Sequence, residues 1–176
     1  RCGWGNGQDY TKSIGDFTDP EFREQQIKQT RDMVRNSFNH PSVIIHAFLN
    51  EPGSWSKECK SLIDELIATV KAENSGRLVT FACNIWETDI CNENTDIVAF
   101  NTYPGLIPCF PGEPDSFKRK VNDNLNTIIS TFRQRYPDKP IMVSETGCGA
   151  VYGALPVARG LRRCGGQHLR LPLERE

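Results

Sequence analysis

Four short, nearly continuous apolar runs alternate with longer segments in which apolar residues recur every three or four positions. The apolar runs span residues 42–51, 78–83, 96–101 and 141–145. Runs of this length are typical of strands that a parallel sheet buries on both faces. We therefore predict four parallel strands at these positions.

Residues 59–70 carry the clearest helical pattern, with apolar side chains at positions i, i+3, i+4, i+7, i+8 and i+11. This spacing places all of these side chains on one face of a helix. Ser54 or Ser56 is the expected N-cap, and Gly76 is expected to close the segment. Residues 117–132 show a similar spacing and predict a second amphipathic helix.

The N-terminal part of the chain gives a weaker signal. Residues 1–18 are rich in glycine and polar residues and show no period, so they predict a loop. A helix is expected to start at Pro20, with Thr18 or Asp19 as its N-cap, because proline is favoured at the first helical position.

The predicted elements follow one another as helix, strand, helix, strand, loop, strand, helix, strand. Such alternation is typical of βαβ units, in which helices cover the outer face of a parallel sheet. We therefore assign the chain to the α/β class. Only the connection between the second and third strands lacks a helical pattern.

The composition is that of an ordinary globular domain: 38% of the 176 residues are apolar, 24% are charged, and the formal net charge is -1. A net charge near zero gives no basis for nucleic-acid binding by the whole chain. No run approaches the roughly 18 apolar residues of a membrane span. No basic segment precedes an apolar one, so we expect no signal peptide within these residues.

The seven cysteines favour free, buried thiols, as a reducing compartment such as the cytoplasm would maintain. They are Cys2, Cys59, Cys83, Cys91, Cys109, Cys148 and Cys164. None forms a C-x-x-C pair and only three histidines accompany them, so no metal site is predicted. A Cys83–Cys91 disulfide and a catalytic thiol are the alternatives.

The charge pattern changes near residue 151. Residues 1–150 contain 16 Lys and Arg against 20 Asp and Glu, whereas residues 151–176 contain 5 Arg against 2 Glu. We predict a domain over residues 1–153 and a separate, aperiodic tail over residues 154–176, which is either disordered or the product of a frame shift. A nucleic-acid-binding tail is the weaker alternative, because no aromatic residues are interleaved with the arginines.

Two acidic residues stand at the ends of predicted strands: Glu51 follows the first strand, and Glu145 ends the fourth. In α/β folds this edge of the sheet carries the active site. Either residue alone could be a solvated loop acid, but their matching positions favour a shared site. Two carboxylates across a cleft suit glycoside hydrolysis, in which one protonates the leaving oxygen and the other attacks the anomeric carbon.

Three sequence motifs support this interpretation. RNSFNHPSVIIHAFLNEP (35–52), DIVAFNTYPG (96–105) and KPIMVSETG (139–147) resemble the catalytic domain of glycoside hydrolase family 2, which includes β-galactosidases, β-glucuronidases and β-mannosidases. The resemblance implies a partial (β/α)8 TIM barrel, in which this chain supplies strands four to seven. The chain is shorter than the roughly 250 residues of a complete barrel. We therefore expect the missing strands, or an oligomer, to complete the fold.

The resemblance also implies roles for individual residues. Glu51 matches the family's acid/base and Glu145 its nucleophile. Asn50 matches the residue that contacts the 2-position of the sugar, and Tyr103 matches the tyrosine that holds the nucleophile ionised. Trp86, after the second strand, is either a stacking face for a sugar or a packed loop residue.

The implied activity is retaining, exo-acting hydrolysis of a β-linked glycoside or oligosaccharide, without a metal or an organic cofactor. An endo-acting, cellulase- or mannanase-like hydrolase of the same barrel type is one alternative. A non-catalytic sugar-binding or defunct fragment is the other.

Overall fold

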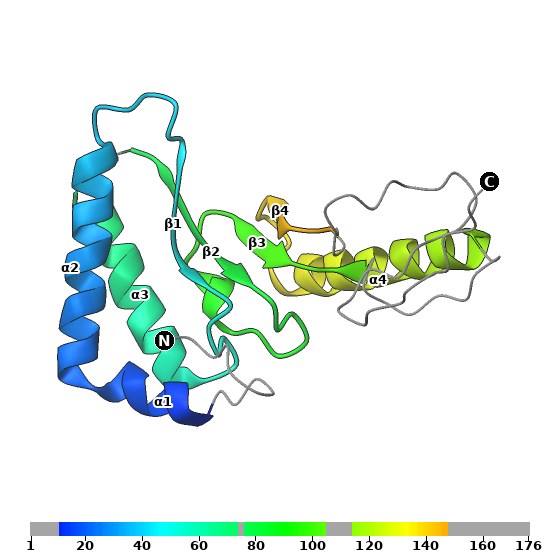
Figure 1. Ribbon diagram of the computed structural model, residues 1–176, viewed down its shortest axis with the longest axis horizontal. Coiled ribbons are helices and arrows are strands. Elements are labelled where there is room, and N and C mark those ends of the chain that lie inside the picture. Colours follow the sequence, from blue (N-terminus) through cyan, green and yellow to red (C-terminus); the bar gives the residue numbers. More distant parts are fainter. Residues whose placement is uncertain (1–10, 74–75, 105–113, 148–176) are drawn as a thin grey trace, which may run out of the picture.

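In the computed structural model, which describes residues 11–73, 76–104 and 114–147, four strands form one parallel sheet (Figure 1). The strands are β1 (Ile45–Asn50), β2 (Leu78–Cys83), β3 (Val98–Asn101) and β4 (Ile141–Glu145). Their order in the sheet follows the sequence. The predicted α/β class with four parallel strands is confirmed.

The helices lie outside this sheet (Figure 1). They are α1 (Thr11–Thr18), α2 (Pro20–Ser37), α3 (Lys57–Ala72) and α4 (Pro114–Arg135), with a short 3₁₀ turn, η1 (Cys91–Glu93). Helices α2 and α3 pack against each other beside β1 and β2. Helix α4 packs against β3, where the ring centroids of Phe100 and Phe132 lie 5.7 Å apart. The β2–β3 connection contains only η1, as its sequence predicted.

The hydrophobic core lies between the sheet and its helices. All six apolar positions predicted on the face of α3 are buried. They are Cys59, Leu62, Ile63, Leu66, Ile67 and Val70. From the sheet, Phe81 and Phe100 contribute fully buried rings. The apolar period of α3 therefore marks the surface that packs against the strands.

The prediction of a loop over residues 1–18 is wrong for the part that the structure describes, because residues 11–18 form α1. Phe17 is fully buried in the core, and its ring lies 6.4 Å from that of Phe22. Arg23 Nη1 also donates a hydrogen bond to Phe17 O at 2.9 Å. These tertiary contacts outweigh the low helix propensity of the glycine in this segment.

The N-terminal helix caps agree with the sequence. The Asp19 carboxylate caps α2 by accepting a hydrogen bond from Glu21 N at 3.1 Å. The Ser56 hydroxyl caps α3 by accepting one from Cys59 N at 3.0 Å. The predicted closure of this helix at Gly76 is wrong, because α3 ends at Ala72 and Glu73 is its C-cap. Gly76 lies before β2 with a φ of 66°, a left-handed conformation that favours glycine.

The three cysteines within the described residues are buried free thiols: Cys59, Cys83 and Cys91. The alternative of a Cys83–Cys91 disulfide is therefore wrong. Burial, followed by the charge of Asp89, raises the pKa of the Cys83 thiol to about 12. Its reactive thiolate is consequently scarce at neutral pH.

Several sequence predictions fall outside the described residues. These include the other four cysteines, the boundary at residue 153 and the Arg-rich tail. Among the described residues, no group of three or more histidine, cysteine or acidic side chains could hold a metal ion. In the same part of the chain, no helix has the length and hydropathy needed to cross a bilayer.

Candidate active site

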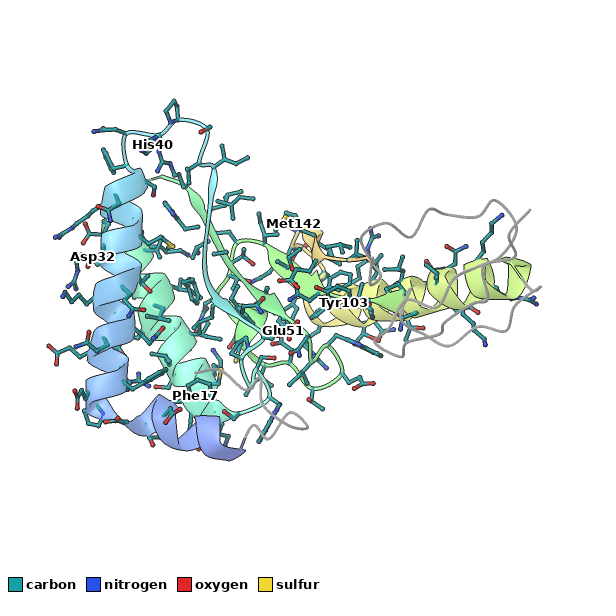
Figure 2. All side chains as sticks on the ribbon, in the orientation of Figure 1. Phe17, Asp32, His40, Glu51, Tyr103 and Met142 are labelled. Carbon is teal, nitrogen blue, oxygen red and sulfur yellow. The ribbon has the colours of Figure 1, made fainter. Side chains whose placement is uncertain are left out.

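The predicted site residues lie where the strands end. Asn50 ends β1 and Glu51 follows it, Glu145 ends β4, and Tyr103 comes two residues after β3. Figure 2 shows Glu51 and Tyr103 at this end of the sheet. The charge of Glu51 acts on the Tyr103 phenol, so the two side chains are also electrostatic neighbours.

The backbone turns sharply at Glu51. The register between β1 and β2 shifts between Ala47 and Asn50, and Glu51 N donates a hydrogen bond to Ala82 O at 2.8 Å. Glu51 has a φ of 48°, and among the described residues it is the only one other than glycine with a positive φ. For a residue with a side chain this conformation costs about 1–2 kcal/mol. Strain of this kind is concentrated at functional sites.

Two asparagines donate hydrogen bonds to the Glu51 carboxylate. Asn101 Nδ2 lies 2.8 Å from Oε1, and Asn84 Nδ2 lies 3.2 Å from Oε2. The Glu51 residue is only 5% exposed. The carboxylate is therefore held inside the protein by neutral amide donors that contact both of its oxygens.

Sequence reasoning did not single out Asn101, which connects three strands. Its Nδ2 also donates to Asn50 Oδ1 at 3.0 Å, while its Oδ1 accepts a hydrogen bond from Ser144 Oγ at 2.7 Å. A signal for this role exists in the sequence, because Asn50, Asn84 and Asn101 each end or directly follow an apolar run. Each of these amides therefore lies at the same edge of the sheet.

Glu145 has a different environment from Glu51. The Tyr103 hydroxyl donates a short hydrogen bond to Glu145 Oε2, and Thr102 N donates to Glu145 O at 2.9 Å. The hydrogen bond from the Tyr103 hydroxyl to Glu145 is the main cause that raises the pKa of Tyr103. Desolvation and the charges of Glu145 and Glu51 raise it further. The phenol therefore stays protonated, and remains a donor to Glu145, at neutral pH.

Trp86 lies on the loop after β2, and it packs against the hydrophobic core. Arg135 of α4 holds this loop by donating hydrogen bonds to the carbonyls of Trp86, Glu87 and Asp89 at 3.2, 2.8 and 2.7 Å. This packing favours a structural role for the indole, and a sugar-stacking role stays a prediction.

The site thus combines two carboxylates with unlike surroundings. Glu51 is buried and amide-bound, whereas Glu145 is partly exposed and bonded to a phenol. Paired acids with different environments are suited to separate roles, one as a proton donor and one as an ionised nucleophile. This arrangement is compatible with acid–base chemistry and nucleophilic attack at a single bond.

Comparison with known proteins identifies one family. The model described as "Glycosyl hydrolases family 2, TIM barrel domain" matches residues 6–155. The chain is 29% identical over 131 residues to a beta-glucuronidase of Canis lupus familiaris, covering 74% of this chain and 19% of that protein. It is 28% identical over 129 residues to a beta-glucuronidase of Bacteroides fragilis, covering 73% and 17%.

Solved structures give the same result. The chain is similar to a beta-galacturonidase of family GH2 from Eisenbergiella tayi bound to galacturonate, with a TM-score of 0.69 and 26% identity. That match covers 80% of this chain and 24% of the other. The four strands and their helices therefore correspond to part of a TIM barrel, and the chain spans less than a quarter of these relatives.

Proposed function

Because the chain belongs to the TIM-barrel domain of glycosyl hydrolases family 2, we propose that the protein hydrolyses a β-glycosidic bond with retention of configuration. The observation that carries this proposal is the pair of strand-end carboxylates with unlike surroundings. Retention requires the two carboxyl groups to lie about 5–5.5 Å apart when substrate is bound.

Glu145 is the nucleophile and Glu51 is the acid/base. In the first step Glu145 attacks the anomeric carbon while Glu51 gives its proton to the leaving oxygen, which forms a covalent glycosyl-enzyme. In the second step Glu51 takes a proton from water, and the water displaces Glu145 from the sugar. The buried position of Glu51 keeps water from competing for its proton, in agreement with this division of roles.

Tyr103 and Asn50 assist these steps. The Tyr103 hydroxyl donates a hydrogen bond to Glu145 Oε2, which orients the carboxylate and leaves the attack to Oε1. Asn50 is exposed at the end of β1 and is held by Asn101, so its amide is available to the 2-hydroxyl of a sugar. Hydrogen bonds to this hydroxyl strengthen in the transition state.

The proposed substrates are β-linked hexuronides. The proposal rests on the relatives, which are beta-glucuronidases and a beta-galacturonidase. A panel of aryl β-glycosides that carry glucuronic acid, galacturonic acid, galactose or mannose tests it directly. The highest kcat/KM should fall on one of the two uronides. Faster turnover of a neutral sugar, or of a β-linked polymer, would contradict the substrate class.

We also infer that other barrel strands cover the sheet edges. Strands β1 and β4 form the two outer positions of the described sheet. Val143 of β4 is 42% exposed, and Ile44, which directly precedes β1, is 66% exposed. Unpaired edges and exposed apolar side chains favour association. Light scattering of the full-length natural protein tests the source of these strands, because a monomer would exclude a second copy.

The roles of the two acids are tested by azide rescue in the full-length natural protein. Azide should restore turnover of an activated aryl glycoside to both Glu145→Ala and Glu51→Ala. The Glu145 variant should yield an α-glycosyl azide, because azide replaces the nucleophile. The Glu51 variant should yield a β-glycosyl azide, because azide then attacks the glycosyl-enzyme. Glu87→Ala, on the exposed loop after β2, is the control and should keep full activity.

Rescue with the opposite pair of anomers would reverse the assignment of the two acids. Unchanged activity in both variants would contradict the proposed site altogether.

A further inference from the structure

We propose that Ser144 and Asn101 form a positioning pair that controls where the proton of Glu51 can go. The proposal rests on the proposed role of Glu51 as acid/base. Ser144 contacts Asn101 and Asn101 contacts Glu51, so neither residue has to contact the substrate to have this effect.

The hydrogen bonds around Asn101 have a defined direction. Its Nδ2 faces two oxygen atoms, Glu51 Oε1 at 2.8 Å and Asn50 Oδ1 at 3.0 Å. Its Oδ1 faces Ser144 Oγ at 2.7 Å. Because an amide oxygen can only accept, the Ser144 hydroxyl must be the donor in this last contact.

A reversed Asn101 amide would interfere with catalysis. Its Oδ1 would then face Glu51 Oε1 and could accept the carboxyl proton that the first step has to deliver to the leaving oxygen. In the observed orientation, Asn101 and Asn84 both donate to Glu51. In this orientation neither amide accepts a hydrogen bond from the Glu51 carboxyl, so neither competes with the leaving oxygen for its proton.

The fold brings Ser144 to this position. Phe100 of β3 pairs with Val143 of β4, but the next residue, Asn101, pairs with Glu145 because the register shifts by one. Ser144 is the residue that this shift leaves without a register partner, and its hydroxyl is the one that contacts Asn101. Asn101 is 5% exposed, so water is a poor substitute for the serine hydroxyl.

The experiment compares two leaving groups in the full-length natural protein. Hydrolysis of a phenyl β-glycoside needs protonation of the leaving oxygen, whereas hydrolysis of the dinitrophenyl β-glycoside of the same sugar does not. Ser144→Ala should lower kcat/KM on the phenyl substrate by about 10-fold or more, which is a part of the roughly 100- to 10,000-fold that general-acid catalysis contributes. On the dinitrophenyl substrate the change should stay within about 2-fold, because general-acid assistance contributes little there.

Three variants make the comparison specific. Ser144→Thr keeps the hydroxyl and should restore most of the activity on the phenyl substrate. Asn101→Ala should slow both substrates, because Asn101 also holds Asn50, but it should slow the phenyl substrate more. This variant covers the case in which Ser144→Ala does not fold. Ser37→Ala removes a serine hydroxyl that donates to Met33 O in α2 and should change neither rate.

Glu51→Gln distinguishes the acid/base role of Glu51 from the positioning role of Ser144 and Asn101. If it slows both substrates equally, Glu51 is not the acid/base, and the positioning role falls with it. If Glu51→Gln is selective for the phenyl substrate but Ser144→Ala and Asn101→Ala are not, the proposed function stands and the positioning role is wrong. Equal loss on both substrates in the Ser144 and Asn101 variants would show a merely structural effect.

Discussion

Two tyrosines should respond in opposite ways to the loss of their hydroxyl groups. Tyr136 is 8% exposed, and its hydroxyl donates to Asp89 Oδ2 at 3.0 Å. Tyr103 is 39% exposed and donates to Glu145. We expect Tyr136→Phe to reduce stability with little effect on activity, and Tyr103→Phe to reduce activity with little effect on stability.

The magnitude for Tyr136 follows from the surroundings of Asp89. This carboxylate is fully buried and also accepts hydrogen bonds from the backbone N–H groups of Cys91 and Asn92, both at 3.3 Å. A hydrogen bond to a charged group contributes about 1.5–3 kcal/mol. Loss of the Tyr136 hydrogen bond should raise the equilibrium constant for opening around η1 by a factor of about 10 to 150, since 1.4 kcal/mol corresponds to a factor of ten.

Hydrogen exchange measures this effect directly. The amides of Cys91 and Asn92 should exchange about 10- to 150-fold faster in Tyr136→Phe than in the natural protein. In Tyr103→Phe they should exchange at the natural rate, while kcat/KM falls on phenyl and dinitrophenyl glycosides alike. Unchanged exchange in Tyr136→Phe, or full activity in Tyr103→Phe, would refute this reasoning.

Two further predictions concern buried groups. His46 is 2% exposed, its Nε2 has no hydrogen-bond partner among the described residues, and burial followed by the charge of Arg77 lowers its pKa. A lowered pKa favours the neutral ring in the folded state, so its contribution to stability is present above a pH of about 6.5 and is lost as the pH falls below it. The free energy of unfolding in urea should therefore fall more for the natural protein than for His46→Phe as the pH is lowered. A difference between the two proteins that does not change with pH would contradict this. Cys83 should react with a thiol reagent only after unfolding, because burial raises its pKa to about 12, and rapid labelling of the native protein would contradict this.

Much of the fold could be predicted because its strands are short, nearly continuous apolar runs, which are buried in β2 and β3 and half-exposed in β4. The apolar runs at residues 78–83 and 141–145 coincide with β2 and β4. Helix α1 could not be predicted, because its sequence shows no clear period and its buried residue Phe17 belongs to a core that α2 and α3 help to form. A local sequence pattern shows which segments form amphipathic elements. It does not show which aperiodic segment becomes helical by packing against the core.

The site could be predicted only in part, for a related reason. Glu51 and Glu145 were found because charged residues stand out directly after apolar runs. Asn101 and Asn84 do not stand out in this way, because neutral amides are common at the ends of strands and in turns. The left-handed backbone at Glu51 was also missed, since it results from the bulge between β1 and β2 rather than from the residue type.

The central claim is that Glu145 forms a covalent bond to the sugar while Glu51 handles the proton. The most direct test incubates the full-length natural protein with a dinitrophenyl 2-deoxy-2-fluoro-β-glycoside of its preferred sugar, which slows breakdown of a glycosyl-enzyme, and locates the adduct by peptide mass spectrometry. We predict a single fluoroglycosyl group on Glu145, and the same adduct in Glu51→Gln. An adduct on Glu51, or hydrolysis with inversion and no adduct, would contradict the account.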